Sequence, residues 1–171
     1  IVADGLGQLE SPPIQKLTKL LNAPQAKIRQ MAVRSLGRTY ASYDHQVYEA
    51  LTQRLQDDDE AVLMETLFVL TNRQVRFATP QVIALWEKSN AEIRVKILES
   101  LSSIGTEEAI PFLMRIVKTG STQEAENAIW TLRWLGAYPE LIQLFKQDHE
   151  HRVLVTQLLG ASEDPKVIPL L

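Results

Sequence analysis

The feature that most constrains the fold is an apolar segment that recurs every 27 to 34 residues along the chain. Each copy follows a small or polar turn and continues as apolar residues that end near a leucine. A period of about 20 to 50 residues is typical of repeat architectures, in which neighbouring units bury each other's apolar faces. The leucines that align the copies are Leu6, Leu36, Leu70, Leu101, Leu132 and Leu159.

A second apolar stretch precedes each of these segments, so the repeated unit has two halves. Its apolar residues fall three or four positions apart, as at Ile110, Leu113 and Val117, which is the period of an amphipathic helix. No segment alternates as a half-buried strand would. The stretches read PIQKLTKLL, VYEALTQRL, PQVIALWEK, AIPFLMRIV and PELIQLFKQ.

Helix-boundary residues separate the two halves of each unit. The polar residues between the halves are typical N-caps for the second helix, and they are NAP at 22–24, DDD at 57–59, SN at 89–90, GST at 120–122 and Asp148. Glycines at or after the ends of the second helices predict left-handed residues that close each helix, and these are Gly37, Gly105, Gly136 and Gly160.

These patterns predict an all-α fold, an α-α superhelix (solenoid) of about five helical hairpins. The predicted hairpins span about 13–40, 45–74, 80–105, 108–136 and 139–160. A half unit at 1–10 and the start of another unit at 166–171 flank them. We therefore expect residues 1–171 to form a single repeat domain cut from a longer chain.

Composition excludes several classes of protein. The chain has 171 residues, 45% of them hydrophobic and 23% charged, which is typical of a folded domain rather than a disordered one. A net charge of −3 makes nucleic acid an unlikely partner. The absence of cysteine excludes disulfides, cysteine zinc sites and cysteine nucleophiles. No apolar run is long enough for membrane insertion and no signal peptide is visible, so we expect a cytoplasmic location.

Three strings carry a resemblance to a known family: KIRQMAVRSLG, EIRVKILESLSSIGTEEAIPFL and VLVTQLLGASEDPKVIPLL. They resemble the HEAT-like repeats of the phycobilisome-lyase type. The resemblance implies a right-handed α-solenoid of bacterial type, in a family whose repeats serve bilin lyases, assembly scaffolds and regulatory domains alike. It also implies a ladder of arginines paired with turn carboxylates. Arginine is present at 29, 94 and 152, but Leu63 and Ala125 interrupt the ladder.

The second helices are expected to line the concave side of the solenoid, which is the usual binding surface. Helical angles place an apolar set on their outward face: Met64, Phe68, Val95, Trp130 and Trp134. This pattern indicates a groove for an apolar peptide or helix. Alternatively, the helical phase differs from the one assumed here and these residues belong to the core.

Two polar features have competing interpretations. Arg34 and Arg38 share the outward face one turn apart, within a basic set that also contains Lys27, Arg29, Arg73 and Arg76. They could bind an acidic peptide or a phosphate, but a solvated face balanced by the carboxylates at 57–60 is the simpler interpretation. The segment DHEH at 148–151 could contribute metal ligands, but neighbouring residues in one turn rarely converge on an ion, so we expect a polar turn.

The sequence therefore predicts a non-catalytic protein–protein interaction scaffold that presents a concave helical surface to a protein or peptide. No nucleophile elbow, phosphate-binding loop or HExxH motif is present, and we expect no catalytic residues, metal or cofactor. Three alternatives stay open: a chromophore-handling protein of the bilin-lyase type, a nucleic-acid-binding HEAT-like domain, and a structural spacer. The oligomeric state is not predicted.

Overall fold

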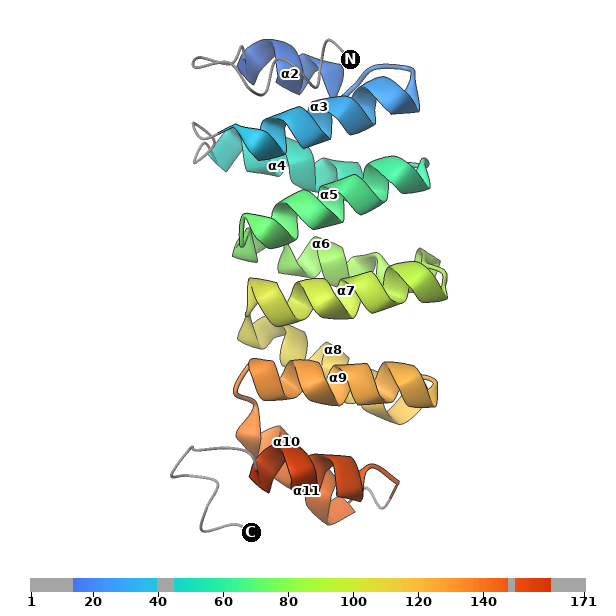
Figure 1. Cartoon of the computed structure of the whole chain (residues 1–171), viewed down its shortest axis with the longest axis vertical. Helices are drawn as coiled ribbons and strands as arrows, with labels where there is room; N and C mark the ends of the chain where they lie inside the picture. Colours follow the sequence, from blue (N-terminus) through green and yellow to red (C-terminus); the bar gives the residue numbers. More distant parts are fainter. Residues whose placement is uncertain (1–13, 40–44, 148–149, 161–171) are drawn as a thin grey trace. The chain divides into compact units, whose positions relative to one another are not determined.

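The computed structural model describes residues 14–39, 45–147 and 150–160. Within these ranges the chain forms ten α-helices and four short 3-10 helices, and no strand (Figure 1). The predicted half unit at 1–10, the predicted unit start at 166–171, and Asp148 and His149 lie outside the described residues.

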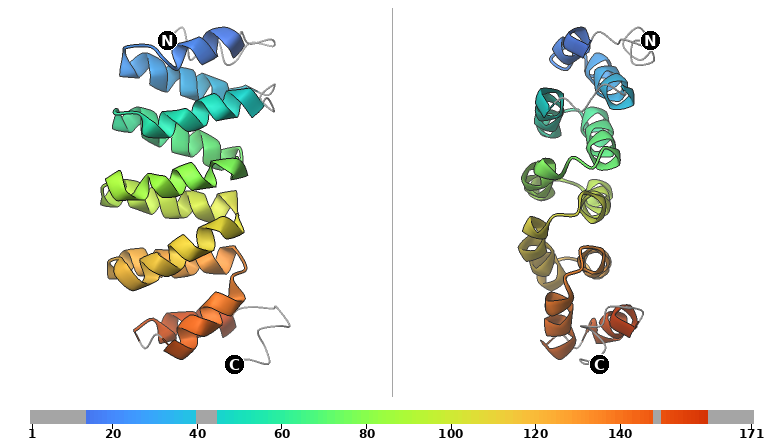
Figure 2. Two further views of the ribbon diagram at one scale, coloured as in Figure 1. Left: turned by 180° about the vertical axis from the view of Figure 1, so that it is seen from behind. Right: turned by 90° about the vertical axis from the view of Figure 1, so that its left-hand side faces the viewer.

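The chain folds as two compact units, the first ending at Ser89 and the second beginning at Asn90. In the first unit, α3 packs on α2 and on α5, and α5 packs on α4. The helices α3 and α5 form one layer, and α2, α4 and α6 form the other (Figure 2). The helices are α2 (Ile14–Leu20), α3 (Ala26–Arg38), α4 (His45–Gln53), α5 (Glu60–Asn72) and α6 (Thr79–Ala84), with the 3-10 helices η1 (Arg54–Gln56), η2 (Arg76–Ala78) and η3 (Trp86–Lys88).

The second unit repeats this arrangement. Helix α9 lies between α7 and α11 and also packs on α8 and α10, which form the other layer (Figure 2). Both units are stacks of paired helices, so the predicted all-α solenoid of helical hairpins is confirmed. The helices are α7 (Ala91–Ile104), α8 (Ile110–Thr119), α9 (Thr122–Trp134), α10 (Tyr138–Gln147) and α11 (Arg152–Gly160), with η4 (Glu107–Ala109) before α8.

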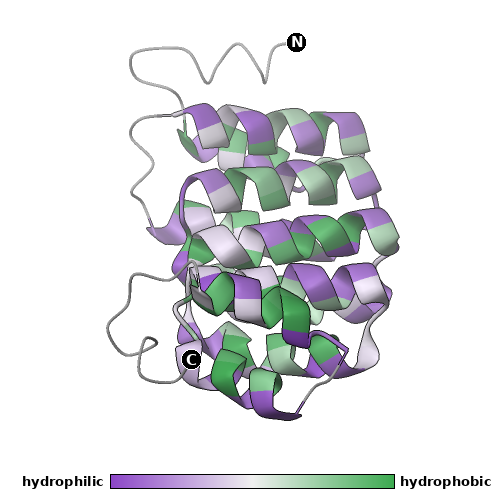
Figure 3. Ribbon diagram, turned by 60° about the horizontal axis from the view of Figure 1, so that its bottom comes forward, coloured by the Kyte–Doolittle hydropathy of each residue, from purple (hydrophilic) through white to green (hydrophobic). Residues whose placement is uncertain are grey.

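The leucines that align the sequence repeats anchor the core. Each one in the described residues is at most 1% exposed: Leu36, Leu70, Leu101, Leu132 and Leu159. The helices are amphipathic, with hydrophilic and hydrophobic residues alternating along their ribbons (Figure 3). Burial of these apolar faces between neighbouring helices supplies the main driving force for stacking.

The N-termini of three second helices are capped as the polar clusters predicted. The prediction is wrong for the NAP cluster at 22–24, because Gln25 precedes α3 and makes no side-chain cap bond. The Asp59 side chain accepts from the backbone N–H groups of Ala61 and Val62, and Asn90 accepts from that of Ile93. Ser121 and Glu124 form a reciprocal capping box at the start of α9. These bonds satisfy backbone donors that the first helical turn leaves without partners.

The glycines near the C-terminal ends of the second helices are of two kinds, left-handed and helical. Gly105 and Gly136 have φ of 60° and 69°, so their prediction as left-handed residues is confirmed. The same prediction is wrong for Gly37 and Gly160, which are helical residues of α3 and α11. At Gly37 a Cβ would lie 2.5 Å from Cγ2 of Val69, so glycine is needed there for close packing of α3 on α5.

Candidate functional site

An apolar surface is exposed on the outward face of the second helices. Phe68 is 63% exposed, Trp130 47% and Trp134 71%, whereas Met64 and Val95 are half-buried. The alternative that the two tryptophans are core residues is therefore wrong. The remaining tryptophan, Trp86, is the one that is buried.

Helix α9 presents Trp130 and Trp134 outward because its other face is held in the core. Ala125, Ala128 and Leu132 are buried on that inner face, and the two alanines allow close packing of the neighbouring helices. The tryptophans are four residues apart, so they lie one turn apart on the same side of the helix. Together they form an aromatic ridge, here called the α9 ridge.

A hollow lies on each side of the α9 ridge. The hollow between α7 and α9 has a volume of about 160 Å³ and includes Val95 and Leu98 in its wall. The hollow between α9 and α11 has a volume of about 230 Å³ and is lined by Trp130, Arg133, Trp134, Gln157 and Leu158. Both tryptophans line both hollows, so one pair of side chains forms the wall between them.

Polar contacts hold α7 and α9 in place beneath the first hollow. Arg94 Nη1 lies 3.2 Å from Glu124 Oε1, and the Thr131 hydroxyl donates to the Leu98 carbonyl at 3.4 Å. Burial alone would raise the pKa of Glu124, but hydrogen bonds from Ser121 and Arg94 outweigh it and hold the pKa below its ordinary value. These contacts join the two helices that form the walls of the hollow.

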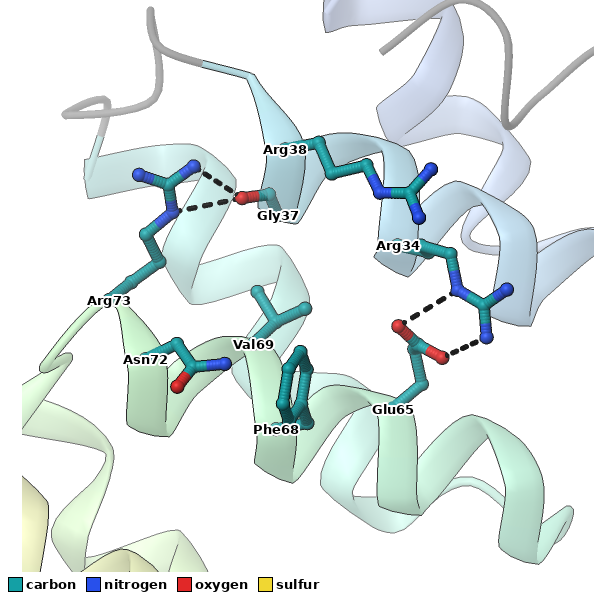
Figure 4. A pocket seen from close by; sticks show the side chains of 8 residues that line it. All are labelled: Arg34, Gly37, Arg38, Glu65, Phe68, Val69, Asn72 and Arg73. Atoms are coloured by element: carbon teal, nitrogen blue, oxygen red, sulfur yellow. Dashed lines mark hydrogen bonds and ion pairs between the residues drawn. The ribbon is translucent and has the colours of Figure 1, made fainter. Parts of the chain in front are cut away.

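A second surface feature in the first unit is a cationic pocket of about 370 Å³ between α3 and α5 (Figure 4). Arg34 and Glu65 form a bidentate pair across it, with Nε–Oε1 and Nη2–Oε2 distances of 3.1 and 2.6 Å. The carboxylate that pairs with Arg34 is thus on α5, whereas Arg29 of the same basic set pairs with Asp57 in the acidic turn at 57–60. The pocket is lined by Arg34, Gly37, Arg38, Glu65, Phe68, Val69, Asn72 and Arg73, and we refer to it as the α3–α5 pocket.

Two charged residues of the α3–α5 pocket, Glu65 and Arg73, were not placed there by sequence reasoning. Arg73 donates from Nε to the Gly37 carbonyl at 2.9 Å, forms a second, shorter bond to the same oxygen from Nη2, and also reaches the Thr39 carbonyl. The sequence showed Arg73 only as one member of a basic set. Its position at the end of α5, one repeat after the end of α3, is the signal that could have placed it beside Arg38.

Arg29 contributes to the structure rather than to the exposed surface. Its Nε and Nη2 donate to both carboxylate oxygens of Asp57 at 2.8 and 2.7 Å, which joins α3 to the turn before α5. Leu63 and Ala125 are buried at the equivalent positions of their helices. Arg152 donates from Nε to the Phe145 carbonyl at 3.1 Å. The arginine ladder is thus interrupted, as the sequence predicted.

The described residues offer no group of three or more His, Asp or Glu side chains that could hold a metal ion. In the DHEH segment, Glu150 is exposed and His151 is buried, while the first two residues lie outside the described ranges. None of the described helices combines the length and the apolar character needed to cross a membrane.

Comparison with known proteins identifies the repeat. The family model for HEAT repeats matches residues 1–70 and 48–133. A solved structure described as an engineered protein is similar in fold, with a TM-score of 0.62 at 20% identity, over 98% of this chain and 85% of that one. The comparison with curated proteins gave no match. Since the family model covers most of the sequence, the chain belongs to the HEAT-repeat family.

Proposed function

We propose that this chain is an interaction scaffold that binds an apolar peptide segment of a partner protein on the α9 ridge. HEAT repeats generally act as protein-interaction scaffolds. The observation that carries the proposal is that Trp130 and Trp134 are both exposed and line hollows on both sides of α9.

Burial of the exposed tryptophans by a partner would contribute to the free energy of binding. A single apolar side chain on a surface needs no explanation, but neighbouring tryptophans beside two hollows provide a large area that a partner can bury. Tryptophan is enriched among the residues whose truncation weakens interfaces most, with losses of about 2 kcal/mol or more. The α9 ridge therefore has the composition of an interface centre.

The hollows favour small apolar side chains presented by a peptide. The walls of the α9–α11 hollow include both tryptophans and Leu158, with Arg133 and Gln157 contributing polar groups. Arg133 lies over the Tyr138 ring, 5.6 Å from its centroid, which orients its guanidinium. A peptide crossing α9 can place one apolar side chain in each hollow and use the polar groups for hydrogen bonds.

The proposal is tested by selecting binding peptides from a random displayed library against the immobilised chain. We expect selected peptides to carry at least two apolar residues. Trp134→Ala should weaken their binding about thirtyfold, because about 2 kcal/mol of buried contact is lost. The thermal midpoint should hardly change, because Trp134 is 71% exposed in the folded chain.

Val153→Ala is the matched control for loss of an exposed apolar group. Val153 is 70% exposed on α11 and does not line either hollow. This variant should bind the selected peptides as tightly as the original chain does. Peptides whose affinity is unaffected by both Trp130→Ala and Trp134→Ala would show that the α9 ridge is not the binding surface.

A further inference from the structure

We infer that the α3–α5 pocket is a separate binding site for an acidic peptide segment. In this site a carboxylate of the ligand pairs with Arg38 and Arg73, and an adjacent apolar side chain packs on Phe68. The site belongs to the first unit and shares no residue with the α9 ridge, so it stands independently of the function proposed above.

The charge of the pocket is the first argument. Arginine outnumbers acidic residues in its lining: Arg34, Arg38 and Arg73 line it together with Glu65, in a chain whose net charge is −3. Figure 4 shows the side chains of Arg34 and Arg38 on one side of the pocket and that of Arg73 on the other. A ligand carboxylate that enters the pocket would be attracted by these guanidinium groups.

The second argument is that the pocket is organised in advance. Arg73 is held by the carbonyl oxygens of Gly37 and Thr39, which carry no net charge, so its position is fixed while its positive charge persists. The bidentate Arg34–Glu65 pair shows that a carboxylate already fits a guanidinium in this pocket. A guanidinium fixed in this way loses little conformational entropy when it binds a further carboxylate.

The third argument is the mixture of charge and apolar surface. Phe68 is 63% exposed and lies in the wall of the same pocket. A ligand with an apolar residue next to an acidic one would use both features. A nucleic acid is a poorer fit, because its affinity comes from neutralising many phosphates along the backbone and this pocket offers three arginines.

The experiment is a titration of the full chain, labelled with ¹⁵N and observed through its arginine side-chain N–H signals by NMR. The probe is a short acetylated and amidated peptide with the core Glu-Glu-Leu between Gly-Ser flanks. We expect saturable shifts at Arg38 and Arg73. The matched peptide with the core Gln-Gln-Leu should bind at least about tenfold more weakly, since charge-assisted hydrogen bonds are lost.

Variants separate the pocket from general electrostatic attraction. Arg38→Gln should lower the affinity for the Glu-Glu-Leu peptide about tenfold. Lys118→Gln removes one charge from an exposed position on α8 and should leave affinity unchanged. Glu65→Gln should strengthen binding, because it removes the carboxylate that already occupies Arg34. Phe68→Ala should lower the affinity for the Glu-Glu-Leu peptide without changing how that affinity depends on salt concentration.

Three results would overturn the inference. The first is equal affinity for the Gln-Gln-Leu and Glu-Glu-Leu peptides, and the second is an equal loss of affinity in Arg38→Gln and Lys118→Gln. The third is that inorganic phosphate or an oligothymidylate binds more tightly than the peptide and shifts the same arginine signals. Far-ultraviolet circular dichroism confirms that each variant is folded before it is titrated. Trp130→Ala and Trp134→Ala should leave this titration unchanged, so failure here and failure of the α9 ridge are distinguishable.

Discussion

At the scale of single residues, the best-defined charged group of the first unit is Asp57. Its side chain is 2% exposed and receives two hydrogen bonds from Arg29. Burial alone would raise the pKa of this carboxyl, but the bonds from Arg29 and from the Asp59 backbone N–H hold it below the ordinary value. A lowered folded-state pKa means that the ionised form stabilises the fold.

Asp57→Asn should therefore lower the free energy of unfolding at neutral pH by about 3 kcal/mol, because it leaves Arg29 without its anionic partner in a mostly buried position. In the original chain this contribution is present above the unfolded pKa, at about pH 4, and is lost as pH falls through the lower folded value. The variant should lack that part of the acid transition. Urea unfolding followed by circular dichroism at pH 7 and at pH 3 measures both effects.

Asp58→Asn makes the same change of charge at an exposed neighbouring residue and is the control. It should leave both unfolding curves nearly unchanged, because exposed charges contribute little to stability. Identical curves for the two variants would mean that the Arg29–Asp57 pair does not stabilise the fold.

At this scale the sequence predicted which side chains are exposed better than it predicted which side chains form ion pairs. Helical angles alone placed Phe68, Trp130 and Trp134 outward, since the direction of a side chain follows from its position in a regular helix. They could not show that Arg34 pairs with Glu65, because that contact joins two helices whose separation and register depend on packing.

At the scale of the helix, the backbone is strained at the C-terminal end of α5 but not at the C-terminal end of α9. Both helices close with the same pair of hydrogen bonds, from Gln74 and Val75 after α5 and from Gly136 and Ala137 after α9. Gln74 has a φ of 50°, in the left-handed region that disfavours residues with a Cβ. Gly136 adopts a similar conformation without that penalty.

Gln74→Gly should raise the stability of the chain by about 1 kcal/mol, because it removes the left-handed strain of a side-chain-bearing residue. Gly136→Ala should lower stability by a similar amount. No atom lies within 4 Å of a Cβ built at Gly136, so the backbone conformation is the only cause of that loss. Thermal unfolding followed by circular dichroism measures both shifts, and unchanged midpoints would contradict the assignment of strain.

Sequence patterns predicted the N-caps of α5, α7 and α9 because capping is local: a side chain bonds to a backbone group two or three residues away. Glycine was ambiguous, because it serves either a left-handed turn or a close approach between helices. Gly105 and Gly37 have these two different roles, and only the packing of α3 against Val69 distinguishes the second.

At the scale of the whole molecule, charge argues against nucleic acid as a partner. The net charge is −3, and the arginines of the α3–α5 pocket form a compact group rather than a long track. We expect no retention of duplex DNA at about 50 mM salt, where nonspecific binding would be strong. An electrophoretic mobility assay measures this, and a complex that weakens steeply with added salt would contradict the prediction.

The sequence by itself determined that the chain is a HEAT-type stack of helical hairpins, since period, helical spacing and capping are local properties that survive in any arrangement of the units. It also offered two positions for Trp130 and Trp134, outward or in the core, and the exposure of both side chains in the structure decided between them. Only the tertiary structure decided what those residues form together: the α9 ridge between two hollows, and the α3–α5 pocket that joins Arg73 to Arg38 and Phe68. The physical reason is that a hollow is the space left between helices after their cores have packed, and that space is set by contacts between distant segments such as Gly37 and Val69.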